Sequence, residues 1–286
     1  MKLKIILFNG FDVCMNIVIF YLKDADIFFL MNQKDLTEIL ETIAPPELAH
    51  DFDAGRIGLV IDLLYEKNRQ IRRVAVALDV TKNVLKKAAE FKADILICHH
   101  TPIFHAVNII NQSLAEKLKI IFDNNISVYA MHTNYDDADG GINSVLANRL
   151  GLKNCERCDA GIIGNVPAQS ADEFSKFVAA CLKTHLVYAG DNVIKKVLIC
   201  GGSCFNKTSL EIAKQNNVDA FISSELKHSD VLRERGHMTL IDAGHYATEN
   251  PGMEELGDKI QKLAAEKFNE KLDILFIADD PELKSI

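Results

Sequence analysis

The sequence predicts an α/β protein of two similar lobes with mainly parallel sheets, packed around a central cleft that holds two metal ions. Three observations support this prediction. Short β-branched apolar runs alternate with helical patterns from Ile71 onward, which is typical of parallel sheets covered by helices. The order of elements in the first half recurs in the second. Clusters of His, Asp and Glu follow several of the expected strands, where ligands tend to bind in such folds.

The first lobe is expected over residues 31–151. Thr81 should cap the helix that follows it, because a threonine side chain can accept a hydrogen bond from the first turn of a helix. Gly151 should end the last helix of this lobe. The expected elements are, in order, a helical segment at 32–50, a strand at 72–80, a helix at 82–91, a strand at 94–98, a helix at 113–125, a strand at 126–130 and a helix at 141–151.

Residues 152–170 contain two glycines and one proline and are interpreted as an irregular connection between the lobes. The second lobe is expected over residues 171–286. Its segment 195–225 repeats the pattern of 72–100: strand, turn, helix, Asp-led strand and polar pair. The alternative is that any two βαβ units look this similar. The expected elements are a helix at 171–185, strands at 195–200, 219–223, 238–243 and 272–278, and helices at 209–217, 229–236 and 252–268.

Residues 1–30 are apolar and aromatic but are interrupted by charged residues. The longest uncharged stretch, 13–22, is shorter than the ~20 residues that a membrane-spanning helix needs, and no convincing signal-peptide cleavage site follows. Two interpretations remain for this N-terminal extension: translation begins at Met31, or the segment adds a strand or hairpin to the fold. We expect a cytoplasmic protein with no membrane partner.

Composition and charge exclude some classes of binding partner and some roles for the cysteines. The net charge is −8 and no basic run is present, so no nucleic-acid partner is expected. The seven cysteines are odd in number and scattered, which argues against a disulfide framework. Cys98 and Cys200 lie in apolar runs, where a reduced thiol acts as a small hydrophobe. Cys155 and Cys158 form a lone CxxC that lacks the second pair of a zinc site.

His99 and His100 leave the strand at 94–98. Adjacent residues at a strand end point in different directions, so this pair is suited to give one imidazole to each of two ions. Pro102 restricts the conformation of the residue before it and helps to fix the exit of the chain. The alternative is a surface or core pair without function.

His132 and Asp136 follow the strand at 126–130. Asp136 is a candidate metal ligand, and His132 is either a ligand or a group that hydrogen-bonds a ligand carboxylate. The alternative interpretation is a turn before the next helix, since Asn and Asp favour such turns. The two interpretations are compatible, because capping residues and ligands share this location.

His245 and Glu249 follow the strand at 238–243 and are four residues apart. If the chain is helical here, both side chains lie on one face; Pro251 makes a loop with one helical turn an equal alternative. A carboxylate has two oxygens, so Glu249 is suited to bridge two ions.

These side chains are too many for one open tetrahedral site and match two ions. Two metals ~3.5–4 Å apart typically share a hydroxide that attacks carbon or phosphorus. The mixed nitrogen and oxygen donors suit Zn, Mn or Fe better than Ca or Mg. Two divalent ions per subunit are therefore the expected cofactors.

Two further features follow strands in the second lobe. Glu225 is a candidate general base or substrate-binding residue, and otherwise caps the next helix. The turn Gly201-Gly202-Ser203 has backbone amides that could cradle a phosphate, although a short Gly-rich match is a weak motif and a simple tight turn is the alternative.

The segments ADILICHHTPIF, HTNYDDADGGINSVLANRLGL, DAFISSELKH and LIDAGHYATE resemble the GTP cyclohydrolase I type 2 family, also called the NIF-three-like family. The resemblance runs from Asp35 to the C-terminus. It implies two α/β lobes, a pair of metal ions between them and a ring-shaped homohexamer. It also implies that the metal ligands are His99, His100, Asp136, His245 and Glu249, with His132 close by.

The sequence departs from the family at 51–62, which replaces a segment usually like wDNVGLQVG, and at 223–225, where SSE replaces TGE. The expected function is a dinuclear metal-dependent hydrolase in which a metal-bound hydroxide attacks and Glu249 bridges the ions. The resemblance implies GTP as the small-molecule substrate and opening of its imidazole ring. The alternatives are a metal-binding regulatory or scaffold protein without turnover and a dimetal phosphoesterase.

Overall fold

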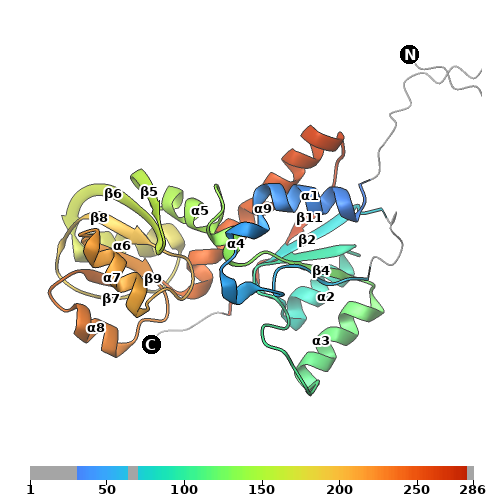
Figure 1. Ribbon diagram of the computed structural model, residues 1–286, viewed down its shortest axis with the longest axis horizontal. Coiled ribbons are helices and arrows are strands. Elements are labelled where there is room, and N and C mark those ends of the chain that lie inside the picture. The colour runs from blue at the N-terminus through green and yellow to red at the C-terminus, as the bar shows by residue number, and fades with distance from the viewer. Residues whose placement is uncertain (1–30, 64–69, 282–286) are drawn as a thin grey trace, which may run out of the picture.

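The computed structural model describes residues 31–63 and 70–281; the expectations for residues 1–30 lie outside this range. Figure 1 shows two α/β lobes side by side, with α4, α5 and α9 between them. The predicted two-lobe α/β fold is confirmed. None of the helices in the described part of the chain is long and apolar enough to cross a membrane.

The first lobe is built on a five-stranded sheet in which β2, β3, β4 and β11 are parallel and β1 runs antiparallel to β4. Its strands lie in the order β1 (Gly58–Ile61), β4 (Ser127–Ala130), β3 (Ile95–Cys98), β2 (Arg73–Ala77) and β11 (Asp273–Phe276). Helices cover both faces: α1 (Gln33–Ile43), α2 (Lys82–Glu90), α3 (Gln112–Asp123) and the C-terminal part of α9 (His245–Phe268).

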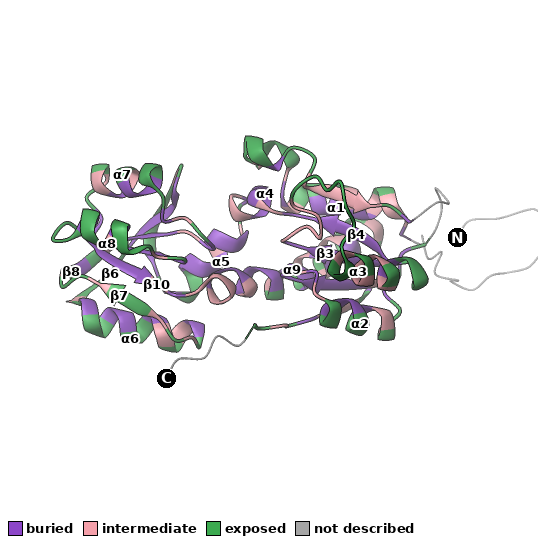
Figure 2. Ribbon diagram, turned by 90° about the horizontal axis from the view of Figure 1, so that it is seen from below, coloured by how far each residue is buried: buried purple, intermediate pink, exposed green. Residues whose placement is uncertain are grey.

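Side chains of β2 alternate between two hydrophobic clusters, as the twofold period of a strand requires. Val74 and Val76 pack with α1 and α9 on one face, whereas Ala75 and Ala77 pack on the other, with Leu85 of α2 among their neighbours. Thr81 caps α2 by accepting from the Val84 amide, as predicted. Figure 2 shows the buried strands and the exposed outer surfaces of the covering helices.

The second lobe is built on a six-stranded sheet in which only β8, β9 and β10 are mutually parallel. The order is β5 (Lys153–Cys158), β6 (Gly161–Ser170), β8 (Val193–Ile199), β9 (Ala220–Ser223), β10 (Thr239–Asp242) and β7 (Val187–Ala189). Its helices are α5 (Ile142–Arg149), α6 (Ala171–Leu182), α7 (Lys207–Gln215) and α8 (His228–Glu234). The remaining elements of the fold are the short helices η1 (Pro46–Leu48), η2 (Asp51–Asp53) and α4 (Thr133–Asp136).

The structure differs from the expected division of the chain in three places. Helix α5, expected at the end of the first lobe, packs Leu146 and Leu150 into the core of the second lobe. Residues 152–170 are not an irregular connection: they form β5 and β6, and β6 pairs with β8 inside the second sheet. The glycines there belong to strands, where Gly161 lets the backbone of Ile199 approach closely. Residues 273–276 do not belong to the second lobe, because β11 pairs in parallel with β2 of the first sheet.

The cysteines also differ from expectation. Cys200 and Cys204 form a disulfide, although the sequence suggested a reduced thiol at Cys200. The two residues lie on either side of a tight glycine turn that returns the chain on itself, and this local geometry is not visible in cysteine counting. Cys98 is free and buried, as expected, and Cys155 and Cys158 are also free.

Candidate metal centre

The predicted ligand side chains gather at the junction of the two lobes. Three groups of these residues each place their ligand atoms within 4.8 Å of one another, close enough for each group to hold a metal ion. The groups share members and therefore form one cluster. They are His99 with His100 and His132; His100 with His245 and Glu249; and His99 with Asp136 and Glu249.

The topology explains this convergence. β3 and β4 are parallel neighbours, so the residues after their carboxyl ends emerge at the same edge of the sheet. The chain is helical from His245 onward, with Pro251 inside α9. His245 and Glu249 therefore lie on one face of the helix, which resolves the two alternatives for this segment in favour of a continuous helix.

Glu249 lies between the imidazoles with its two oxygens facing different partners. Its Oε1 is 3.7 Å from Nε2 of His99. Its Oε2 is 3.3 Å from Nε2 of His100 and 3.1 Å from Nε2 of His245. The rings of His99 and His100 diverge, with an interplanar angle of 64°.

Several polar atoms at the centre of this cluster are buried but make no hydrogen bond. They are Nε2 of His99, Oδ1 of Asp136, Nε2 of His245 and Oε2 of Glu249. Nε2 of His245 and Oε2 of Glu249 are close, but their relative orientation does not meet hydrogen-bond geometry. Buried polar groups are rarely left unpaired. Nitrogen and oxygen atoms that converge without hydrogen-bonding one another can share their lone pairs with a cation. These residues therefore fit a metal ion.

The opposite nitrogen of each imidazole is held by an acceptor outside the cluster. Such partners fix the tautomer and orientation of histidines that bind metals. Nδ1 of His99 lies 2.8 Å from the Met131 carbonyl oxygen, and Nδ1 of His100 lies 2.8 Å from a carboxylate oxygen of Asp79. Nδ1 of His132 lies 2.9 Å from Asp53, and Nδ1 of His245 lies 2.9 Å from Glu225. In each ring, Nε2 is thereby left for a ligand role.

Asp53 was not recognised from the sequence. It is fully buried and also accepts hydrogen bonds from the backbone amide and hydroxyl of Thr133. Burial raises the pKa of Asp53, but hydrogen bonds from Thr133 and His132 outweigh it and lower the pKa overall. Asp79 was also missed, although it follows β2 and the same strand-end argument that identified His99 could have found it.

Glu225 contacts His245 through Oε1 while most of its side chain is exposed. Its backbone φ of +62° lies in the left-handed region, which is uncommon for a residue other than glycine. The hydrogen bond from His245 holds the pKa of Glu225 below its usual value, against a smaller effect of burial. The structure thus places Glu225 as an orienting partner of an imidazole.

Charges in the cluster are strongly coupled. Burial, followed by the positive charges of His100 and His132, lowers the pKa of His99 well below its ordinary value and keeps that ring neutral. Burial and the neighbouring Glu249 carboxylate raise the pKa of Asp136 well above its ordinary value. A cation bound here would reverse this repulsion between acids.

The glycine turn lies against the cluster but does not present its first two amides to a phosphate. The amide of Gly201 donates to Asn143 Oδ1, and that of Gly202 donates to Thr248 Oγ1. Ser203 lies near Glu225 and helps to lower the pKa of that carboxylate. At Gly202, φ is +69° and a Cβ would overlap Oε1 of Glu249. The turn is therefore packed directly on the shared carboxylate.

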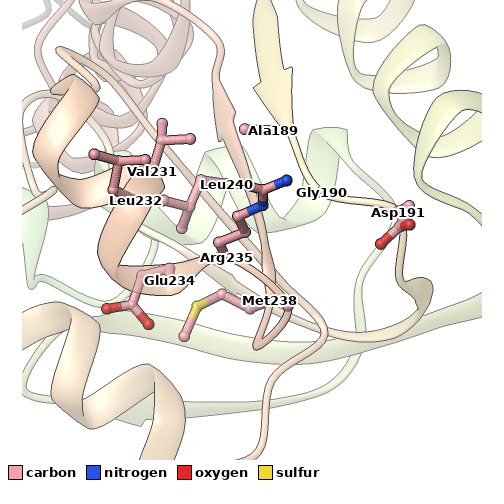
Figure 3. Close-up of a pocket in the computed structure, with 10 residues that line it drawn as sticks. Ala189, Gly190, Asp191, Val231, Leu232, Glu234, Arg235, Met238 and Leu240 are labelled. Atoms are coloured by element: carbon pink, nitrogen blue, oxygen red, sulfur yellow. The ribbon is translucent and has the colours of Figure 1, made fainter.

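A separate cavity of about 380 Å³ lies beside β7 and α8, and none of its lining residues belongs to the cluster. Figure 3 shows Arg235 and Leu240 between α8 and Gly190, while the carboxylate of Glu234 points away from them. That carboxylate lies 3.0 Å from the Lys214 ammonium. Because the cavity gathers no set of ligand atoms, we place the candidate site at the histidine cluster.

The site and the fold together define the class of protein: a two-lobe α/β protein with a His/Asp/Glu cluster between the lobes that could hold a metal. Residues 31–282 match the model of the Duf34/NIF3 (NGG1p interacting factor 3) family. The chain belongs to this family.

Relatives and solved structures agree with this assignment. A GTP cyclohydrolase 1 type 2 homolog of Clostridium perfringens is 30% identical over 250 residues, covering 81% of this chain and 92% of the relative. Reduced HcgD from Methanocaldococcus jannaschii is 27% identical with a TM-score of 0.73, covering 86% of this chain and 97% of that one. A Bacillus cereus protein related to NIF3 shares the fold with a TM-score of 0.79 at 19% identity, covering 90% of this chain and all of the other.

Proposed function

We propose that this chain is a dinuclear metal-dependent hydrolase. The observation that carries the proposal is the position of Glu249, whose two oxygens face two different sets of imidazoles. In this proposal His99 and Asp136 hold one ion, His100 and His245 hold the other, and Glu249 is shared.

His132 completes the set, because its ring nitrogen lies within reach of both His99 and His100. Imidazole and carboxylate donors favour Zn, Mn or Fe. Such ions supply an activated water and polarise the bond under attack. Glu225, Asp79 and Asp53 hold the imidazoles in place, and burial of Glu249 and His99 keeps bulk water from competing for their donor atoms.

The substrate proposal comes from the name of the relatives. We propose GTP, with water added at the carbon between the two nitrogens of the imidazole ring, so that one carbon–nitrogen bond breaks and a formamide remains. A second water would release formate. A cytoplasmic homohexamer is proposed on the same ground of family membership.

The test combines metal content with product analysis. Purified protein is expected to hold two equivalents of Zn, Mn or Fe by elemental analysis, and His100→Ala to hold fewer. Incubation with GTP is expected to give formate or the ring-opened formamide. Metal binding with strong thermal stabilisation but no product would support the scaffold alternative, and release of phosphate would support the phosphoesterase. Either result contradicts the proposed reaction.

A further inference from the structure

An exposed aromatic ring adjoins the metal cluster. Phe52, in η2, is 51% exposed, and its ring centroid is 6.1 Å from that of His132. The ring centroid of Phe52 also lies 5.7 Å from that of His50. Both contacts are close to perpendicular. What distinguishes Phe52 from other exposed apolar side chains is its position: its ring contacts His132 of the cluster and keeps an open face for a ligand that enters there.

Arg56 connects the segment that carries Phe52 to a second segment, which carries Phe104. Arg56 donates from Nε to the Phe104 carbonyl at 2.6 Å and from Nη1 to the Phe52 carbonyl. Its guanidinium also lies over the Phe104 ring, 4.5 Å from the centroid. The Phe104 ring in turn lies 5.6 Å from that of His132. Arg56 thus joins the backbone of Phe52 to Phe104, and both aromatic rings flank His132.

The contacts of Arg56 favour a flat group over a phosphate at this position. Arg56 uses two of its donors on backbone carbonyls and one face on Phe104, so its guanidinium is already engaged. An aromatic ring, by contrast, gains from stacking, which every nucleobase offers. Phe52 supplies an open ring surface for this purpose, whereas Phe104 is partly covered by Arg56.

We propose that Phe52 is a stacking platform for a planar heteroaromatic ring, such as a purine base, which it orients with its edge toward the metal cluster. Phe104 and Arg56 are positioning residues that hold the platform. This inference rests on the proposed function and specifies which residues of the same site select the ring.

The test measures binding of guanosine and of ribose 5-phosphate, which lacks the ring, to the metal-loaded protein by calorimetry. Phe52→Ala is expected to weaken guanosine binding at least tenfold, as loss of one stacking contact does, and to leave ribose 5-phosphate and metal content unchanged. Phe52→Tyr should keep guanosine affinity. Phe122→Ala is the matched control, because Phe122 is 55% exposed on α3 and should not affect binding.

Three results would overturn the platform: no guanosine binding by the wild type, equal affinities of wild type and Phe52→Ala, or a change of oligomeric state in Phe52→Ala, which would show that a second copy covers the ring. The outcome is separable from that of the proposed reaction. If Phe52→Ala turns over GTP with an unchanged KM, the stacking role of Phe52 is contradicted and the proposed hydrolase is supported. If guanosine binding depends on Phe52 but GTP is not turned over, the stacking role is supported and the proposed hydrolase is contradicted.

Discussion

At the scale of single residues, the site depends on acceptors that the ligands themselves do not reveal. The four imidazoles contact four different acceptors through Nδ1: one backbone carbonyl, the partly exposed carboxylate of Asp79, the mostly exposed carboxylate of Glu225 and the fully buried carboxylate of Asp53. Because a buried acceptor is not replaced by water when it is lost, Asp53 should matter most among them.

Asp53→Asn should therefore reduce metal affinity about 10–100-fold, the range found when such outer partners of a metal site are altered. The amide nitrogen would face the Nδ1 proton of His132, and Thr133 would lose an ionised acceptor. Metal affinity is measured by competition with a chelator. Asp51→Asn is the control, since Asp51 is an exposed acid in the same short helix; equal losses in the two variants would contradict a specific role for Asp53.

The pH response of the metal-free protein should reveal His245. Burial lowers the pKa of this imidazole, but Glu249 and Glu225 outweigh it and raise the pKa to about 9, from 6.5. Because the folded-state pKa is raised, the stabilising contribution of protonated His245 is fully present below pH 6.5 and is lost as the pH rises through about 9. Metal competes with this proton, so metal affinity should rise over the same interval.

NMR titration of His245 in chelator-treated protein checks this expectation. Glu225→Gln should give a lower His245 pKa than the wild type, because one of the two carboxylates that raise it is lost. Glu211→Gln, an exposed acid on α7, should leave the pKa of His245 unchanged. A His245 pKa near 6.5 in the wild type would show that the two carboxylates do not act on the ring as the geometry indicates.

At the scale of elements, strand ends were the predictable part of the site. His99, His132 and His245 each follow a strand of the expected kind, and parallel pairing of β3 and β4 brings the first two together. Asp53 was not predictable in this way because it lies in η2, before β1, and reaches His132 only through tertiary packing. The disulfide depends on the tightness of the Gly201–Gly202 turn, which composition does not encode.

The same turn gives a test of how closely α9 must approach the second sheet. Gly202→Ala should reduce metal affinity at least tenfold, because a Cβ would displace Glu249 Oε1 and would lie 3.1 Å from Nε2 of His245. Gly151→Ala is the control: its φ of +68° is nearly the same, and no atom lies within 4 Å of its Cβ.

Both glycine variants should lose about 1–2 kcal/mol of stability from the left-handed backbone. Thermal or denaturant unfolding measures this shared cost, and chelator competition measures the metal affinity that only Gly202→Ala should lose. Unchanged metal affinity in Gly202→Ala would mean that Glu249 can move without effect on metal binding. It would contradict the proposal that Glu249 is shared between two ions.

At the scale of the whole molecule, α9 and β11 make the two lobes interdependent. With 24 residues, α9 is about 36 Å long. It begins at the metal cluster, contributes Leu256 and Ile260 to the core of the first lobe and delivers the chain to β11. The alternation of strands and helices predicted each of these elements. It did not predict that the last strand returns to the first sheet, because local patterns do not specify strand partners.

A chain that ends at Asn269, without β11, tests this arrangement. β2 would become an edge strand, because β11 pairs with it over residues 73–76, and α9 would lose the contacts of Leu272 and Ile274. Hydrogen exchange should therefore become faster in β2 and in the C-terminal half of α9, whereas β8 and β9, deep in the other sheet, should keep their protection. Equal loss of protection in β8 and β9 would show that the two lobes unfold as one cooperative unit. Loss confined to β2 and the C-terminal half of α9 would show that the second lobe keeps its own stability without β11.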